Sequence, residues 1–203
     1  MKALIFDTET TGLLPPSIAR DNYQPRIIEF FGHIIDDDGS SIRELEFFCN
    51  PGIEISEEIT SITGIKKSDV VDAPPFSHYA ESVRGLLQDA DAIVAHNLAY
   101  DWKMLDLELS RCGAGADLGW PKIRICTVKE SLFYKGYRLN LNALHEFLFG
   151  CRFSGSHRAR TDVGALTRCY IEMRKRGIFE GRWALLAVLR FLVRSRVVSV
   201  AWS

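Results

Sequence analysis

The stretch ALIFDTETTG, residues 3–12, joins an apolar run to two acids that are separated by one residue. β-Forming residues fill its first half, which predicts a strand that leads into the acids. Because side chains alternate between the two faces of a strand, Asp7 and Glu9 should point from the same face. Neighbouring carboxylates repel each other unless a cation lies between them, and divalent ions prefer such oxygen ligands. The pair is therefore a candidate metal site, although a lone pair of this kind is more often simply solvated.

A third acid, Asp101, comes shortly after another apolar run, which spans residues 91–95. The segment HNLAYD, residues 96–101, comes next, and a helical pattern continues from there to Gly113. Asn97 stands where a helix-capping residue is expected, so Asp101 should lie early on the helix, just beyond the end of a strand.

The third segment is HRARTD, residues 157–162, which leads into a helical pattern that ends near Gly177. Five residues on a helix turn through roughly 500°, so His157 and Asp162 could not share a face if both were helical. We therefore expect His157 on the loop that enters the helix. Taken alone, His157 would be read as an ordinary surface or core histidine, and Asp162 as an acid favoured by the helix dipole.

Together, FDTETTG, HNLAYD and HRARTD resemble, in order and spacing, the three motifs of the DnaQ-like 3′-to-5′ exonucleases, the class called DEDDh. One departure is Tyr100, where the family often has Phe. The resemblance covers residues 1–178 as one exonuclease domain and implies the ribonuclease H-like fold. It also implies a catalytic set: Asp7, Glu9, Asp101, His157 and Asp162.

By the same resemblance, the four acids are expected to hold two Mg²⁺ or Mn²⁺ ions, and His157 to act as the general base. Histidine in general titrates near neutral pH, which makes proton removal from the attacking water practicable. A shell of carboxylates and water suits these hard ions better than zinc. The implied reaction is hydrolysis of phosphodiester bonds from the 3′ end of nucleic acid, with release of nucleoside 5′-monophosphates.

Other residues near the three segments are candidates for contact with the substrate. Gly12 would allow close backbone approach. The segment SITGI, residues 61–65, resembles a family segment that packs against the terminal nucleotide, whereas its composition alone predicts a helix ended by glycine. The candidate substrate-binding residues are Thr8, Thr10, Thr11, Gly12, Ile62, Asn97, Tyr100, Arg158 and Arg160. The two arginines could bind phosphate, but arginines near the start of a helix are about as often simply exposed at the surface.

Length and composition suit one domain with a substantial core, because the chain has 203 residues and a formal net charge of −1. That charge excludes the basic coat of a protein that covers DNA non-specifically. The five cysteines are odd in number and lack C-x-x-C spacing, which argues against a disulfide framework or a zinc knuckle. With no signal peptide recognised at the N-terminus, we expect a reducing, cytoplasmic location.

The remaining pattern predicts an α/β domain with a mixed five-stranded sheet flanked by helices. Residues 26–35 and 42–49 should form a hairpin around the turn DDDGS, residues 36–40. The other expected elements are short helical pieces over 54–70, a helix over 76–87, strands over 92–95 and 122–126, and helices over 128–134, 141–149 and 159–176.

Residues 179–203 form an apolar extension of uncertain role. Trp183 to Val193 could form a helix, but Arg190, Arg194 and Arg196 make the stretch a poor membrane span, so no membrane partner is expected. A peripheral helix and strand packed on the domain, or a segment that docks a partner, both fit this composition.

Several functional alternatives stay open on the sequence alone. Single-stranded DNA is the expected substrate, in proofreading or repair with a DNA polymerase or other replication partner, whereas RNA 3′-trimming would use the same site. A non-catalytic nucleic-acid-binding subunit could share the fold. Phosphatases of the haloacid dehalogenase type also begin with a strand that ends in D-x-D-x-T, but that mechanism leaves Asp101, His157 and Asp162 without roles.

Overall fold

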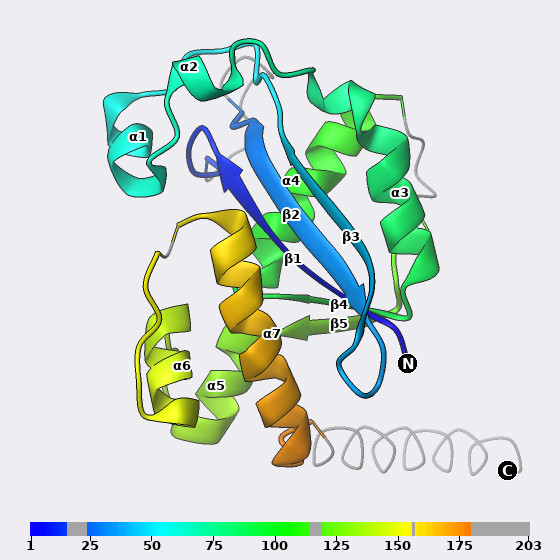
Figure 1. Cartoon of the computed structure of the whole chain (residues 1–203), viewed down its shortest axis with the longest axis vertical. Helices are drawn as coiled ribbons and strands as arrows, with labels where there is room; N and C mark the ends of the chain where they lie inside the picture. The colour runs from blue at the N-terminus through cyan, green and yellow to red at the C-terminus, as the bar shows by residue number, and fades with distance from the viewer. Residues whose placement is uncertain (16–23, 114–118, 156, 180–203) are drawn as a thin grey trace, which may run out of the picture.

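The computed structural model of the chain describes residues 1–15, 24–113, 119–155 and 157–179. Its centre is a five-stranded sheet in the order β3-β2-β1-β4-β5 (Figure 1). The strands are β1 (Ala3–Thr10), β2 (Ile27–Ile35), β3 (Ser41–Phe48), β4 (Ala92–Ala95) and β5 (Ile123–Cys126). β1 pairs antiparallel with β2 and parallel with β4, so the predicted mixed sheet is confirmed.

Turn chemistry forms the hairpin between β2 and β3, as the sequence predicts. The backbone N–H of Ser40 donates to the carboxylates of Asp36 and Asp38, at 2.8 and 3.1 Å. The N–H of Asp36 donates in turn to the carbonyl of Ser40. The aspartates thus satisfy backbone groups that the strands leave unpaired.

Among the described residues, helices and a 3₁₀ turn connect and cover the strands. They are α1 (Glu57–Thr63), α2 (Lys67–Val70), the 3₁₀ turn Phe76–His78, α3 (Ala80–Asp89), α4 (Leu98–Arg111), α5 (Thr127–Lys135), α6 (Leu141–Phe149) and α7 (Ala159–Lys175). The helix predicted to run unbroken over 76–87 is wrong in its first turn. Side chains three residues apart eclipse on a 3₁₀ turn, and there Phe76 and Tyr79 both contact the ring of Phe47.

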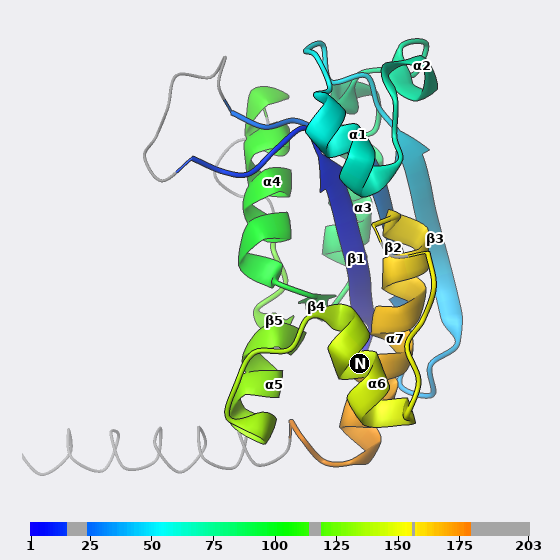
Figure 2. The same ribbon diagram turned by 90° about the vertical axis from the view of Figure 1, so that its left-hand side faces the viewer.

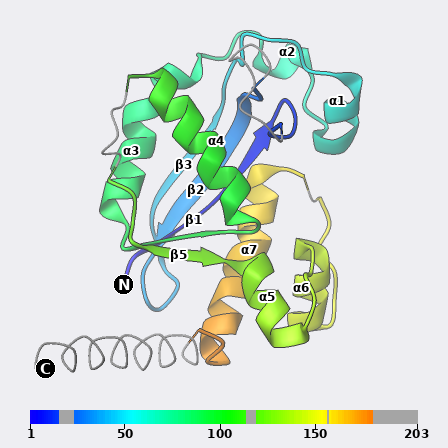
Figure 3. The same ribbon diagram turned by 180° about the vertical axis from the view of Figure 1, so that it is seen from behind.

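The sheet separates two apolar layers, and β1 contributes to both. Leu4 and Phe6 belong to the core shared with α3 and α4, whereas Ala3 and Ile5 belong to the core shared with α6 and α7. Figures 2 and 3 show α7 across one face of the sheet, α4 across the other, and α1 beyond the end of β1. The alternation along β1 therefore directs Asp7 and Glu9 toward α7.

Residues 180–203 of the expected extension, including the predicted helix over Trp183 to Val193, lie outside the described residues. Within the described ranges, no helix is both long enough and apolar enough to cross a membrane.

Candidate active site

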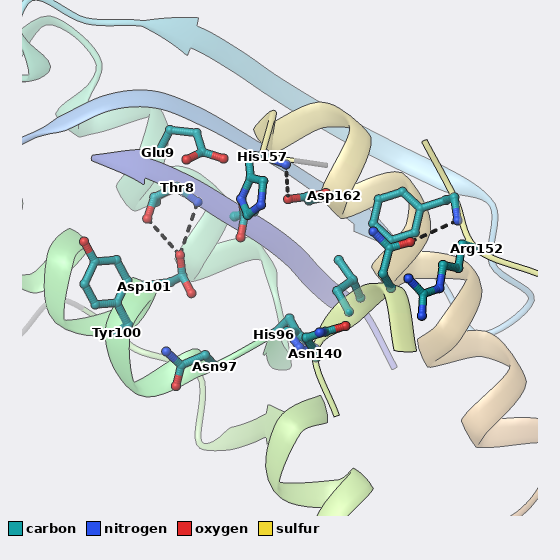
Figure 4. A pocket seen from close by; sticks show the side chains of 14 residues that line it. Thr8, Glu9, His96, Asn97, Tyr100, Asp101, Asn140, Arg152, His157 and Asp162 are labelled. Atoms are coloured by element: carbon teal, nitrogen blue, oxygen red, sulfur yellow. Dashed lines mark hydrogen bonds between the residues drawn. The ribbon is translucent and has the colours of Figure 1, made fainter. Parts of the chain in front are cut away.

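A pocket of about 480 Å³ opens where β1 ends, between the first turns of α4, α6 and α7 (Figure 4). It brings together residues from all three sequence motifs. The predicted residues that line it are Asp7, Thr8, Glu9, Asn97, Tyr100, Asp101, His157 and Asp162. The five predicted catalytic side chains thus share one cavity, although β1, α4 and α7 are far apart in the sequence.

Three carboxylates converge on one side of this pocket. Asp7 and Glu9 come from β1, and Asp162 comes from the first turn of α7. Each offers an oxygen, and these oxygens all lie within 4.8 Å of one another. The predicted shared face of Asp7 and Glu9 is therefore confirmed, and their spacing would allow one small cation to contact all three groups.

The two oxygens of Asp162 have different surroundings. Oδ2 accepts a hydrogen bond from the backbone N–H of His157 at 3.0 Å. Oδ1 is buried and accepts no hydrogen bond from any residue of the described ranges. An unsatisfied buried carboxylate oxygen is costly unless a cation or an ordered water contacts it. The carboxylate cluster thus fits a metal ion by donor type, spacing and unmet bonding capacity.

Asp101 approaches the pocket from α4, on the other side of β1. Its Oδ1 accepts from the Thr8 backbone N–H at 3.2 Å and from the Thr8 hydroxyl at 2.8 Å. The carboxylate is 3% exposed. Thr8, which the sequence suggests as a substrate contact, here orients the fourth acid.

Burial raises the pKa of all four acids, and the charges of neighbouring carboxylates add to the shift at Asp7, Glu9 and Asp162. The pKa of Asp7 lies well above its ordinary value, chiefly through burial and then through the charges of Asp101 and Glu9. Burial, reinforced by the charge of Asp162, raises the pKa of Glu9 to about 8. Burial also raises the pKa of Asp101, to about 7, and that of Asp162. Without a cation the site therefore favours protonated carboxyls.

We expect the metal-free chain to lose stability as the pH rises. A carboxyl whose pKa is higher in the folded state contributes stability below its unfolded pKa and loses it as the pH passes the folded pKa. For Glu9 that window runs from about pH 4.5 to about 8. The melting temperature measured in EDTA should fall by about 10 °C between about pH 5 and about pH 8.5.

Glu9→Gln should flatten this pH dependence, and saturating Mn²⁺ should reduce it, because a bound cation favours the charged carboxylates. Glu54→Gln, at an exposed acid, is the matched control and should leave the slope unchanged. A melting temperature that stays level in EDTA over this range would contradict the raised pKa values of the buried carboxyls.

His157 lies on the loop before α7, as the sequence predicts. Its backbone is left-handed, with φ 67°, and its side chain is exposed. Figure 4 shows its ring in the middle of the pocket, between Glu9 and Asp162. A left-handed backbone is uncommon for a residue other than glycine and costs about 1–3 kcal/mol, so surrounding bonds must hold it.

Asn97 is the residue directly before α4, as expected, but the predicted capping role of its side chain is wrong. Its backbone is left-handed, with φ 76°, and its side chain makes no capping hydrogen bond. Asparagine tolerates this conformation better than most residues. The amide lines the pocket instead.

Tyr100 joins α4 to the end of β1. Its hydroxyl donates to the carbonyl of Gly12 at 2.6 Å and shares a hydrogen bond with the Thr10 hydroxyl. Burial raises the pKa of Tyr100 to about 12. The Tyr that replaces the Phe common in the family thus bonds the segment after β1.

Several predicted substrate contacts lie outside the pocket lining, namely Thr10, Thr11, Gly12, Ile62, Arg158 and Arg160. Ile62 is 48% exposed on α1. The Thr11 hydroxyl accepts from the backbone N–H of Arg26. Both arginines are paired with carboxylates, Arg158 with Glu29 and Arg160 with Glu46. Their substrate roles stay predictions.

The pocket also includes residues that the sequence reasoning missed: His96, Asn140, Leu141, Asn142, Arg152 and Phe153. Asn140 caps α6 by accepting from the Ala143 N–H, and a polar residue before an apolar helix is a signal that could have found it. His96 bonds the Thr127 hydroxyl, and burial lowers its pKa to about 4.

Several known proteins resemble this chain in sequence. A family model described as Exonuclease matches residues 4–170. The PolC-type DNA polymerase III of Caldanaerobacter subterraneus subsp. tengcongensis is 29% identical over 170 residues, which are 84% of this chain but 11% of that protein. The DNA polymerase III subunit epsilon of Rickettsia felis is 27% identical over 183 residues, which are 85% of this chain and 74% of that one.

Solved structures share the fold. The zinc-bound complex of E. coli exonuclease I with single-stranded DNA matches with a TM-score of 0.73 and 17% identity, over 92% of this chain and 45% of that one. A 3′-exonuclease that recognises a histone mRNA stem-loop matches with a TM-score of 0.67 and 18% identity, over 87% of this chain and 64% of that one. These likenesses confirm the ribonuclease H-like fold.

Proposed function

This chain belongs to the exonuclease family, and from that membership we propose that it hydrolyses phosphodiester bonds stepwise from the 3′ end of nucleic acid. The observation that carries the proposal is the carboxylate cluster of Asp7, Glu9 and Asp162, with Asp101 and His157 in the same pocket. Every residue that the resemblance requires for catalysis is therefore present in one cavity.

We propose that the cluster binds divalent cations, Mg²⁺ or Mn²⁺, in a two-metal arrangement. Its ligands are carboxylate oxygens, which such hard ions prefer. Asp7, Glu9 and Asp162 would hold one ion, and Asp101 would help to hold a second. Bound there, the ions would supply positive charge at the scissile phosphate and acidify the attacking water.

Side chains and backbone groups of the chain would then carry out proton transfer and positioning. His157, whose side chain is exposed at the pocket, would accept a proton from the attacking water. Its backbone N–H bond to Asp162 would keep the base beside the carboxylate cluster. Thr8 would hold Asp101 in position through its two hydrogen bonds.

We propose single-stranded DNA as the substrate, in proofreading or repair. The printed names of the sequence relatives, a PolC-type DNA polymerase III and a subunit epsilon, support a DNA substrate and a polymerase or replication partner. The 3′-exonuclease that recognises a histone mRNA stem-loop keeps RNA as the second candidate. DNA and RNA present the same phosphodiester and differ at the 2′-hydroxyl.

Two other readings of the site are less well supported. A phosphatase mechanism with Asp7 as nucleophile gives no role to His157 or Asp162, which share the pocket with it. A non-catalytic binding subunit would not need the complete set of four acids and a histidine. The family membership also favours an enzyme.

Side-by-side digestion of end-labelled single-stranded DNA, duplex DNA and RNA tests the proposal. We expect nucleoside 5′-monophosphates, released one at a time from a free 3′-hydroxyl, with single-stranded DNA degraded fastest. Products should be resolved by chromatography, and Asp7→Ala is the control for contaminating nucleases. Cleavage of circular single strands, or products with 3′-phosphates, would contradict the proposed direction of attack.

A further inference from the structure

Glu29 is a buried acid that directly adjoins the carboxylate cluster but is absent from the predicted catalytic set. It lies on β2, opposite Glu9 of β1, and is 1% exposed. Its negative charge raises the pKa of both Glu9 and Asp162. A further buried charge beside four acids makes the site harder to form, so a compensating contact is expected.

That contact comes from the beginning of α7. The Arg158 guanidinium donates to Glu29 through Nη2 at 2.9 Å and through Nε at 3.2 and 3.3 Å. The backbone N–H of Ala159, the first residue of α7, donates to the second carboxylate oxygen at 3.0 Å. One carboxylate thus binds both a side chain and the helix N-terminus.

These bonds fix the segment that carries His157. The N–H of His157 is bound by Asp162, and the two residues that follow His157 are bound by Glu29. The left-handed backbone of His157 is therefore held at its own N–H and at the two residues that follow it. Without the contacts of Glu29, the segment could relax toward commoner backbone conformations and move the ring away from the cluster.

We propose that Glu29 is a positioning residue of the active site, which fixes the backbone of His157 through the Arg158 side chain and the Ala159 N–H. This inference rests on the proposed exonuclease function. It gives Arg158 a task different from phosphate binding, because its Nε and Nη2 already donate to Glu29.

A double-mutant cycle between Glu29→Gln and His157→Ala tests this role. Glu29→Gln should lower kcat on single-stranded DNA at saturating Mn²⁺ roughly 10- to 100-fold, as expected for the loss of a contact that orients an active-site group, with KM nearly unchanged. In the His157→Ala background, the same change should cost nothing further, because the group that it positions is gone. Equal losses in both backgrounds would overturn the proposal.

Glu46→Gln is the matched control, because Glu46 pairs with Arg160 through a similar fork on β3 but is largely exposed. Its effect on kcat should stay within about twofold. Arg158→Lys keeps the charge beside Glu29 but loses the fork, and should also lower kcat. A raised KM with kcat intact in that variant would instead assign Arg158 to the substrate.

Amide hydrogen exchange over residues 157–159 gives a readout that does not depend on activity. Glu29→Gln should accelerate exchange in this segment, and Glu46→Gln should not. If the wild-type chain degrades no nucleic acid, the proposed function fails, while this measurement still tests whether Glu29 fixes the backbone of His157. Unchanged exchange in Glu29→Gln would overturn that positioning role even in an active enzyme.

Discussion

Replacing Asp7 with alanine will abolish 3′-to-5′ degradation while the chain stays folded. Asp7 lies in the carboxylate cluster and should contact the cations that stabilise charge at the phosphate, an effect worth several kcal/mol in the transition state. We expect a loss in kcat of at least about 10³-fold. The metal-free variant should melt at the same temperature as the wild type or higher, because one repelling carboxylate is removed.

Asp162→Ala should behave in the same way, since it removes another member of the cluster. Glu54→Gln serves as the control at an exposed acid. Activity should be followed on 3′-labelled single-stranded DNA with Mn²⁺, beside melting curves in EDTA. Near-normal activity in Asp7→Ala would show that the metal assignment is wrong.

His157→Ala should lower kcat by roughly 10² to 10⁴, the range usual for loss of a general base. Metal affinity should be almost unchanged, because the clustered oxygens that could bind a metal ion come from three carboxylates. His157 lies on the loop beside them and is not part of that cluster. A general base acts only in its unprotonated form, so at saturating Mn²⁺ the wild-type rate should be lower at acid pH than at neutral pH. That difference should disappear in the variant.

Titration of Mn²⁺ into both proteins, with rates recorded against pH, checks both parts of this expectation. The carboxylate variant Asp162→Ala provides the contrast, since it should lose metal affinity. A large loss of metal affinity in His157→Ala, or an unchanged pH profile, would mean that this histidine has a different role.

The fold was predictable because its signals are local. The apolar run of β1, the aspartate turn after β2 and the glycine that ends α1 each depend on a few adjacent residues. The 3₁₀ turn at Phe76 was not predictable in this way. Its Phe76 and the adjacent Tyr79 pack on the ring of Phe47, a contact with β3 that the local sequence does not reveal.

In the candidate site, too, the features with local signals were predictable and those that depend on distant contacts were not. Asp7 and Glu9 share a face because of strand geometry, which period-two spacing predicts. Glu29 was missed because IIEFF, residues 27–31, reads as a buried strand with one polar exception. Its partner Arg158 is 129 residues away, and only the assembled sheet brings the two together.

The outer strand β3 carries charged side chains that also affect how this molecule meets other molecules. An exposed strand edge can pair with the edge of another sheet, and charged side chains discourage such pairing. Along β3, Arg43 pairs with Asp89, the last residue of α3, and Glu46 pairs with Arg160 of α7. Both strand residues stay largely exposed, at 43% and 40%. The ion pairs that fasten β3 to the helices on its two sides thus also protect the molecule against edge-to-edge aggregation.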